Sequence, residues 1–259
     1  MSFERRDLSA DVDRVRAEHA PEALVLDADR DFETLGPDST VELGVLVDSL
    51  ETVSYPAEWF PDDAPEVLQR CASDLTTVGL PSDGSVTWTR QTDPPVVIVK
   101  PRVEGSPEGF VDFLVAEALV EVGLGVPEAF PGFFEDRYRD LDAAVGGDPA
   151  GTFQVAAALY AGWVGLRTRE VFARWSDRPL AVAWWDAGER LEPRLSDLSG
   201  AVARGELSVP GATELACSAL KHDVDVPSPF SALDTDAYRE RGADFAVAWA
   251  EKTFEQLSE

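Results

Sequence analysis

The stretch PPVVIVKPRVEGSPEGF, residues 94–110, predicts a strand that is followed by a turn and a helix. The continuous apolar run over residues 96–99 is short and follows two prolines, which is typical of a buried strand. Gly105 supplies a turn, and Ser106 is expected to cap the helix that begins at Pro107. Upstream, SDGSVTWTR (82–90) alternates apolar and polar residues, and QTDPP provides a turn between the two runs. We therefore expect a small antiparallel β-hairpin or sheet around residues 85–103, within the segment 82–104.

The segments before and after this hairpin are both predicted to be helical. In residues 1–80, apolar residues recur at helical spacing between prolines, and we expect helices over residues 8–20, 23–35, 40–53 and 65–78. Residues 105–259 begin with an almost wholly apolar helix ending near Gly125 and continue as helices, with Gly162 and Gly165 permitting close approach of a neighbour. The prediction is a mostly α (α+β) protein, a multi-helix single domain over residues 1–259 with little β-structure.

The charge is strongly acidic along the whole chain. The 49 acidic residues outnumber the 22 basic ones, giving a formal net charge of −27, and almost all of the basic residues are arginine. Nucleic-acid binding through a basic face is disfavoured, because neutralising phosphates needs clustered Lys and Arg. Concentrated salt would screen the self-repulsion of such a chain. In this composition the chain resembles uncharacterised protein families of haloarchaea, a resemblance that implies a salt-rich cytosol and no particular activity.

The location and cofactor content can also be predicted from the sequence. The charged N-terminus lacks the apolar run of a signal peptide, and the most hydrophobic window, residues 153–166, is shorter than a membrane span. We expect a cytoplasmic protein without membrane contact. Cys71 and Cys217 lie far apart in apolar helical segments and are predicted to be small core residues. No cofactor and no metal are expected.

Lys100 and Arg102 suggest an anion site beside the start of the following helix. Their side chains, with the backbone amides of Ser106 and Gly109, could hold a phosphate or carboxylate, since a helix N-terminus favours negative charge. The order of glycine turn, strand lysine and helix is also that of a protein-kinase small lobe, but G-x-G-x-x-G is missing. The alternative for both cations is ordinary pairing with nearby carboxylates.

Two further polar clusters have competing explanations. His222, Asp223 and Asp225 follow one another at a helix end and could bind a divalent cation weakly, although a histidine there also complements the helix dipole. The densest basic patch belongs to a long helical segment, in which it either meets an acidic partner or is neutralised by glutamates one turn away. Its arginines are Arg167, Arg169, Arg174 and Arg178, a phosphate could be their partner as well as an acidic protein, and the glutamate within reach of Arg167 and Arg174 is Glu170. No catalytic residue is predicted in either cluster.

Aromatic residues next to prolines and on one helix suggest a protein-binding surface. Trp59 and Phe60 lie in YPAEWFP, and Trp184 and Trp185 lie in RPLAVAWWDAG. Tryptophan is enriched where proteins bind one another. With no catalytic signature in the chain, the leading hypothesis is a non-enzymatic cytosolic protein of a halophile that binds another protein or a second copy of itself. The alternative is an enzyme or sensor that binds a phosphorylated or carboxylated small molecule near Lys100 and Arg102.

Overall fold

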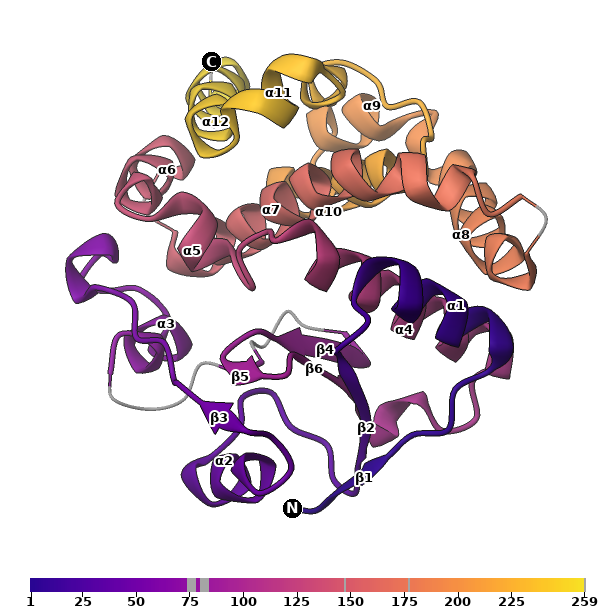
Figure 1. The fold of residues 1–259 in the computed structure, drawn as a ribbon. Helices are drawn as coiled ribbons and strands as arrows, with labels where there is room; N and C mark the ends of the chain where they lie inside the picture. Colours follow the sequence, from indigo (N-terminus) through magenta and orange to yellow (C-terminus); the bar gives the residue numbers. More distant parts are fainter. Residues whose placement is uncertain (74–77, 80–83, 147, 177, 259) are drawn as a thin grey trace. The chain divides into compact units, whose positions relative to one another are not determined.

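The structure is a computed structural model, and it describes residues 1–73, 78–79, 84–146, 148–176 and 178–258 (Figure 1). The chain divides into two compact units, which are described one at a time. The first unit comprises Met1–Tyr55, Gln69–Glu128 and Trp175–Ala183, and the second comprises Pro56–Leu68, Ala129–Arg174 and Trp184–Glu259. The predicted single domain over residues 1–259 stays a prediction.

The first unit contains the β-structure and one long helix. Its elements are β1 (Phe3–Arg5), α1 (Ala10–His19), β2 (Leu24–Ala28), α2 (Pro37–Gly44), β3 (Ser49–Leu50), β4 (Val86–Thr89), β5 (Thr92–Asp93), β6 (Val96–Val99), the 3₁₀ turn η2 (Pro101–Val103) and α4 (Glu108–Leu124). The boundary between the units passes through α3 (Glu66–Cys71) and α8 (Pro179–Leu195).

The second unit is built from helices. Its elements are η1 (Ala57–Trp59), α5 (Phe130–Phe134), α6 (Arg137–Val145), α7 (Pro149–Ala173), α9 (Leu198–Ala203), α10 (Val209–Lys221), η3 (Phe230–Leu233), α11 (Asp236–Arg241) and α12 (Ala243–Ser258), with the part of α8 from Trp184 onwards. The mostly helical α+β fold class is confirmed. None of the helices, over the residues that the structure describes, is long and apolar enough to cross a membrane.

The predicted hairpin is confirmed and belongs to a larger mixed sheet. β4 and β6 pair antiparallel, with Trp88 opposite Val97, and the strand order is β1-β2-β6-β4. β6 is buried along its whole length, because it pairs in parallel with β2 on its other side. Inside the hairpin, β5 leaves this sheet and pairs with β3 instead.

The helix predicted over residues 23–35 is wrong, and the N-terminal 80 residues are therefore not wholly helical. Residues 24–28, LVLDA, form strand β2, in register with Val96–Val99. Apolar residues at helical spacing are equally compatible with a short buried strand, and pairing with β6 decides between them. The helix predicted over residues 40–53 is also wrong in part, since α2 ends at Gly44 and β3 pairs with β5 at residues 49–50.

Helices α1 and α4 pack against each other in the first unit (Figure 1). Both were predicted, and α4 ends as expected at Gly125, which has a φ of 67°. Its start differs from the prediction: the N-cap residue is Pro107 rather than Ser106, it makes no side-chain cap bond, and the Ser106 backbone amide donates to the Val103 backbone oxygen. The predicted helix over 65–78 begins as α3, and residues 74–77, like 80–83 near the hairpin, lie outside the described residues.

In the second unit, α7 and α10 run side by side (Figure 1). The close approach predicted at two glycines of α7 is confirmed. A Cβ atom on Gly162 would lie 2.9 Å from the Cys217 sulfur, and one on Gly165 would lie 2.8 Å from the Lys221 Cα atom. This contact fixes the C-terminal end of α10, and the residues that follow it form one wall of the site described next.

Candidate functional groove

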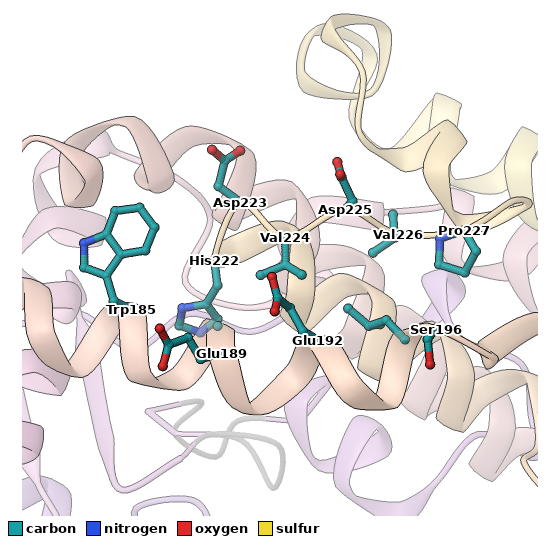
Figure 2. A pocket seen from close by; sticks show the side chains of 12 residues that line it. Trp185, Glu189, Glu192, Ser196, His222, Asp223, Val224, Asp225, Val226 and Pro227 are labelled. Carbon is teal, nitrogen blue, oxygen red and sulfur yellow. The ribbon is translucent and has the colours of Figure 1, made fainter.

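A cavity of about 620 Å³ opens on the second unit between α8 and the segment after α10 (Figure 2). We call it the α8 groove. One wall is a face of α8 and the residue that follows it, and the other is the chain over residues 222–227. Its lining residues are Trp185, Gly188, Glu189, Glu192, Leu195, Ser196, His222, Asp223, Val224, Asp225, Val226 and Pro227.

Adjacent tryptophans of α8 have different roles at this groove. Trp184 is 1% exposed, and its indole nitrogen donates a 3.1 Å hydrogen bond to the backbone oxygen of Lys221 at the end of α10. Trp185 is 50% exposed and stands at one end of the groove (Figure 2). The two rings meet edge to face at a centroid distance of 4.6 Å. Trp184 therefore anchors the helix, and Trp185 remains open to solvent.

The two walls are held together by His222 and Gly188. The Nδ1 atom of His222 donates a 3.0 Å hydrogen bond to the backbone oxygen of Trp184. A Cβ atom on Gly188 would approach the Cβ of His222 to 3.2 Å and a methyl group of Val224 to 3.3 Å, so glycine permits this closeness. Burial, and secondarily the charge of Lys221, lowers the pKa of His222 from 6.5 to about 4. His222 is consequently neutral at pH 7.

The charge of the groove is negative. Glu189 stands on α8 beside Trp185 and Glu192 stands farther along the same helix, whereas the carboxylates of Asp223 and Asp225 point away from α8 (Figure 2). Asp223 pairs with Arg169 at 3.3 Å. Within the described part of the chain, Glu189, Glu192 and Asp225 form no ion pair. Trp185, Glu189 and Glu192 are spaced by four and three residues, which places them on one face of the helix.

The four residues predicted as an interaction surface are not all accessible. Of these, Trp185 is the one that lines the groove. Trp184 and Phe60 are buried, and the ring of Phe60 packs at 5.5 Å on that of Tyr138. Trp59 ends η1 and is half-buried. The packing of Trp184 on the end of α10 and on Phe172 of α7 separates the buried tryptophan from its exposed neighbour.

The weak metal site considered at His222, Asp223 and Asp225 is not formed. No group of three or more His, Cys, Asp or Glu residues, among those described, is arranged to hold a metal ion. His222 is occupied with Trp184, and Asp223 with Arg169. Both cysteines are buried thiols, as predicted.

The predicted anion site has its main cation engaged elsewhere. Arg102 donates to Asp31 at 2.8 Å and to Glu33 at 3.0 Å, and its hydrogen bond lowers the pKa of the Asp31 carboxyl. Lys100 is 0% exposed, with its ammonium 4.7 Å from the centroid of the Phe32 ring. The side chain of Ser106 is half-buried, and Gly109 is exposed in the first turn of α4. This arrangement matches the alternative of carboxylate pairing for Arg102, and the anion site stays a prediction.

Of the four arginines in the predicted patch, Arg169 and Arg178 are paired with carboxylates, and neither is paired with Glu170. Arg169 pairs with Asp234 at 2.8 Å, and Arg167 stacks on the Trp163 ring with its guanidinium carbon 3.6 Å from the ring centroid. Glu170 pairs with Arg239 at 3.0 Å, and Arg174 donates to the backbone oxygen of Glu170 rather than to its carboxylate. In the first unit, Arg178 pairs with Glu18 at 3.6 Å.

A second cavity, of about 490 Å³, lies in the first unit beside α1. Arg5, Arg6 and Arg16 line it, but Arg6 pairs with Asp27 at 2.7 Å and Arg16 with Asp13 at 2.8 Å. Its cations are thus mostly matched by carboxylates, in contrast to the unmatched glutamates of the α8 groove.

Sequence reasoning missed Glu189 and Glu192 as site residues. Their spacing from Trp185 in the segment WWDAGERLEP was a visible signal. The opposite wall was not predictable in this way. Residues 222–227 are separated from α8 by the helices α9 and α10, and they carry no motif that indicates contact with α8.

Comparison with protein families gives one match that spans nearly the whole chain. A model described as a family of unknown function (DUF7089) matches residues 2–257. The chain belongs to this family. Membership in DUF7089 confirms the expectation of an uncharacterised family, and it supplies no activity for the α8 groove. Neither the curated proteins nor the solved structures contain a match to the chain.

Proposed function

We propose that this protein is a non-enzymatic binding protein that recognises another protein through the α8 groove. The observation that carries the proposal is Trp185, half exposed at the end of a concave surface while its neighbour Trp184 is buried. A large aromatic ring costs free energy when it is left in water, and such residues dominate binding when a partner covers them. Leu195, Val224 and Val226 extend the apolar lining beyond the ring.

The hydrogen bonds that hold the walls of the α8 groove are those expected of a preorganised recognition surface. α8 is tied to the end of α10 by reciprocal hydrogen bonds, from Trp184 to Lys221 and from His222 to Trp184. A rigid wall loses little conformational entropy when a partner binds, and this favours affinity. The role we assign to His222 is therefore structural.

We also infer that the protein works in the salt-rich cytosol of a halophile. The support is the net charge of −27 over 259 residues. Acidic surface keeps a protein soluble in concentrated salt, where screening reduces self-repulsion.

The test compares wild type with Trp185→Ala and with Val45→Ala as a matched control. Val45 is 77% exposed on the first unit, so its truncation also removes exposed apolar surface. Each protein is used as bait in molar salt with extract from the source organism, and any candidate partner is purified and its binding measured directly. We expect a partner that binds wild type and Val45→Ala and that loses affinity for Trp185→Ala.

Light scattering of the same proteins tests a second copy as the partner. A wild-type dimer that becomes monomeric in Trp185→Ala would support the groove as a homo-oligomer interface. The proposal fails if Trp185→Ala is folded by circular dichroism, yet binds every purified partner and self-associates as wild type does.

A further inference from the structure

We propose that the α8 groove binds a cationic segment of its partner protein, with an arginine of that segment stacked on Trp185 and paired with Glu189 or Glu192. This inference rests on the proposed function, since it names the chemistry of the partner at the same groove. It is drawn from the ring, the carboxylates beside it and the balance of charge on the groove.

The first argument is the exposed face of Trp185. A guanidinium over an indole face is attracted by the negative π-cloud, and arginine stacks there better than lysine because it is planar and weakly hydrated. The same pairing occurs within this chain, where the guanidinium carbon of Arg167 lies 3.6 Å from the centroid of Trp163. Trp185 makes an edge contact with Trp184, and half of its surface is open to solvent.

The second argument is the position of the two glutamates. Along α8, Glu189 lies one helical turn after Trp185, and Glu192 lies about two turns after Trp185. The two glutamates are therefore about 6 and 10 Å from Trp185 along the helix axis, on the same face. Neither forms an ion pair with any residue that the structure describes. A carboxylate binds arginine through two parallel hydrogen bonds, which gives the pair both strength and orientation. Ring and carboxylate are thus spaced for one arginine side chain and its neighbour.

The third argument excludes other occupants by charge and shape. At low salt, a second copy of this chain would bring another net charge of −27 to an acidic groove, and a phosphate or carboxylate ligand would meet the same repulsion, so a basic segment is the favoured occupant. A divalent cation would need convergent ligands, whereas Asp223 is paired with Arg169. The apolar residues Val224, Val226 and Pro227 opposite α8 suit the methylene stems and apolar neighbours of a basic peptide segment.

The experiment measures binding of a fluorescent arginine-containing peptide, with alternating apolar residues, by anisotropy. Counterparts carry citrulline, which keeps the shape of arginine without its charge, or lysine. Titrations run at the lowest salt that keeps the protein folded by circular dichroism, and again in molar salt. The proteins are wild type, Trp185→Ala, the double variant Glu189→Gln/Glu192→Gln, and the control Glu251→Gln/Glu255→Gln, which removes the same charge from exposed positions of α12 in the same unit.

We expect the arginine peptide to bind wild type and the α12 control alike, and to bind both groove variants about tenfold more weakly. Citrulline should abolish most of the affinity, lysine should bind more weakly than arginine, and molar salt should weaken binding. The inference is overturned if the citrulline peptide binds as well as the arginine peptide, if the α12 control loses as much affinity as the groove double variant, or if no peptide binds.

The outcome is distinguishable from failure of the proposed function. A purified partner could lose affinity for Trp185→Ala but bind Glu189→Gln/Glu192→Gln as tightly as wild type. That result would contradict the inference of a cationic partner segment and would still support protein binding at the α8 groove. A partner that ignores Trp185 would remove both.

Discussion

The imidazole of His222 donates from Nδ1 to the backbone oxygen of Trp184 at 3.0 Å, while the indole of Trp184 donates to the backbone oxygen of Lys221 at 3.1 Å. These bonds join α8 to the end of α10 in both directions. They explain why Trp184 is buried and why the next residue, Trp185, is turned toward the groove. Neutral His222 is part of the wall, so protonating it should weaken the structure.

We predict that His222 makes the second unit sensitive to mild acid. Its pKa of about 4 in the folded protein lies below the ordinary 6.5, because burial opposes its charge. Unfolded chains therefore take up the proton first, so the contribution of His222 is complete above pH 6.5 and is lost as the pH falls toward 4. At about 1.4 kcal/mol per pH unit, reduced for partial solvent access, the loss is about 2 to 3 kcal/mol.

Denaturant unfolding of wild type and His222→Asn between pH 7 and pH 4 measures the free energy of unfolding that is lost when His222 is protonated. The amide of asparagine can replace the Nδ1 donor and does not titrate, so carboxylate effects common to both proteins cancel. We expect the unfolding free energy of wild type to fall more than that of His222→Asn as the pH is lowered from 7 to 4. Parallel curves for the two proteins would contradict the assignment.

Gly165→Ala should loosen the contact between α7 and α10. The new methyl group would lie 2.8 Å from the Cα of Lys221, which is backbone and cannot rotate away. Overpacking of this kind costs about 1 to 3 kcal/mol. Thermal unfolding of Gly165→Ala is compared with that of Ala161→Ser, an exposed position on the same helix, for which we expect a change within about 0.5 kcal/mol. Equal stability of the two variants would mean that α10 shifts at no cost.

The sequence was informative where local residues determine the structure. The apolar run at residues 96–99 predicted β6, the glycine at 125 predicted the end of α4, and the glycines of α7 predicted its close neighbour. Strand β2 was missed because LVLDA fits a helix or a strand, and its partner Val96–Val99 lies far along the chain. At the site, Trp184 and Trp185 point about 100° apart on α8, and contacts with α10 and with Phe172 of α7, both distant in sequence, determine which is buried. The groove likewise depends on a second wall that no local pattern places there.

Glu128→Ala should destabilise the hairpin of the first unit. The carboxylate of Glu128 accepts from the hydroxyl of Thr89 at 3.1 Å, from the amide of Gln91 at 2.8 Å and from the backbone amide of Arg90. Thr89 is fully buried, and its hydroxyl, whose oxygen still accepts from the Gln91 backbone amide, would lose the acceptor for its own hydrogen, at a cost of about 2 kcal/mol.

The matched control is Glu104→Ala, which removes an exposed carboxylate that forms no ion pair with the described residues. Urea unfolding should show a lower midpoint for Glu128→Ala and almost none of this shift for the control. If both variants unfold at the wild-type midpoint, the Glu128 bonds contribute nothing measurable to stability.

The last prediction concerns salt. With 49 acidic and 22 basic residues, the folded chain concentrates like charges that the unfolded chain separates. The Debye length falls from about 30 Å at 0.01 M salt to about 3 Å at 1 M, so added salt removes repulsion between all but the nearest charges. We therefore expect the thermal midpoint to rise steadily with potassium chloride. Sucrose, which favours compact states without screening charge, serves as the control and should leave the dependence on potassium chloride intact. A midpoint that does not change with potassium chloride would show that the ion pairs already offset the repulsion, and would remove the support that composition gives to a salt-rich cytosol.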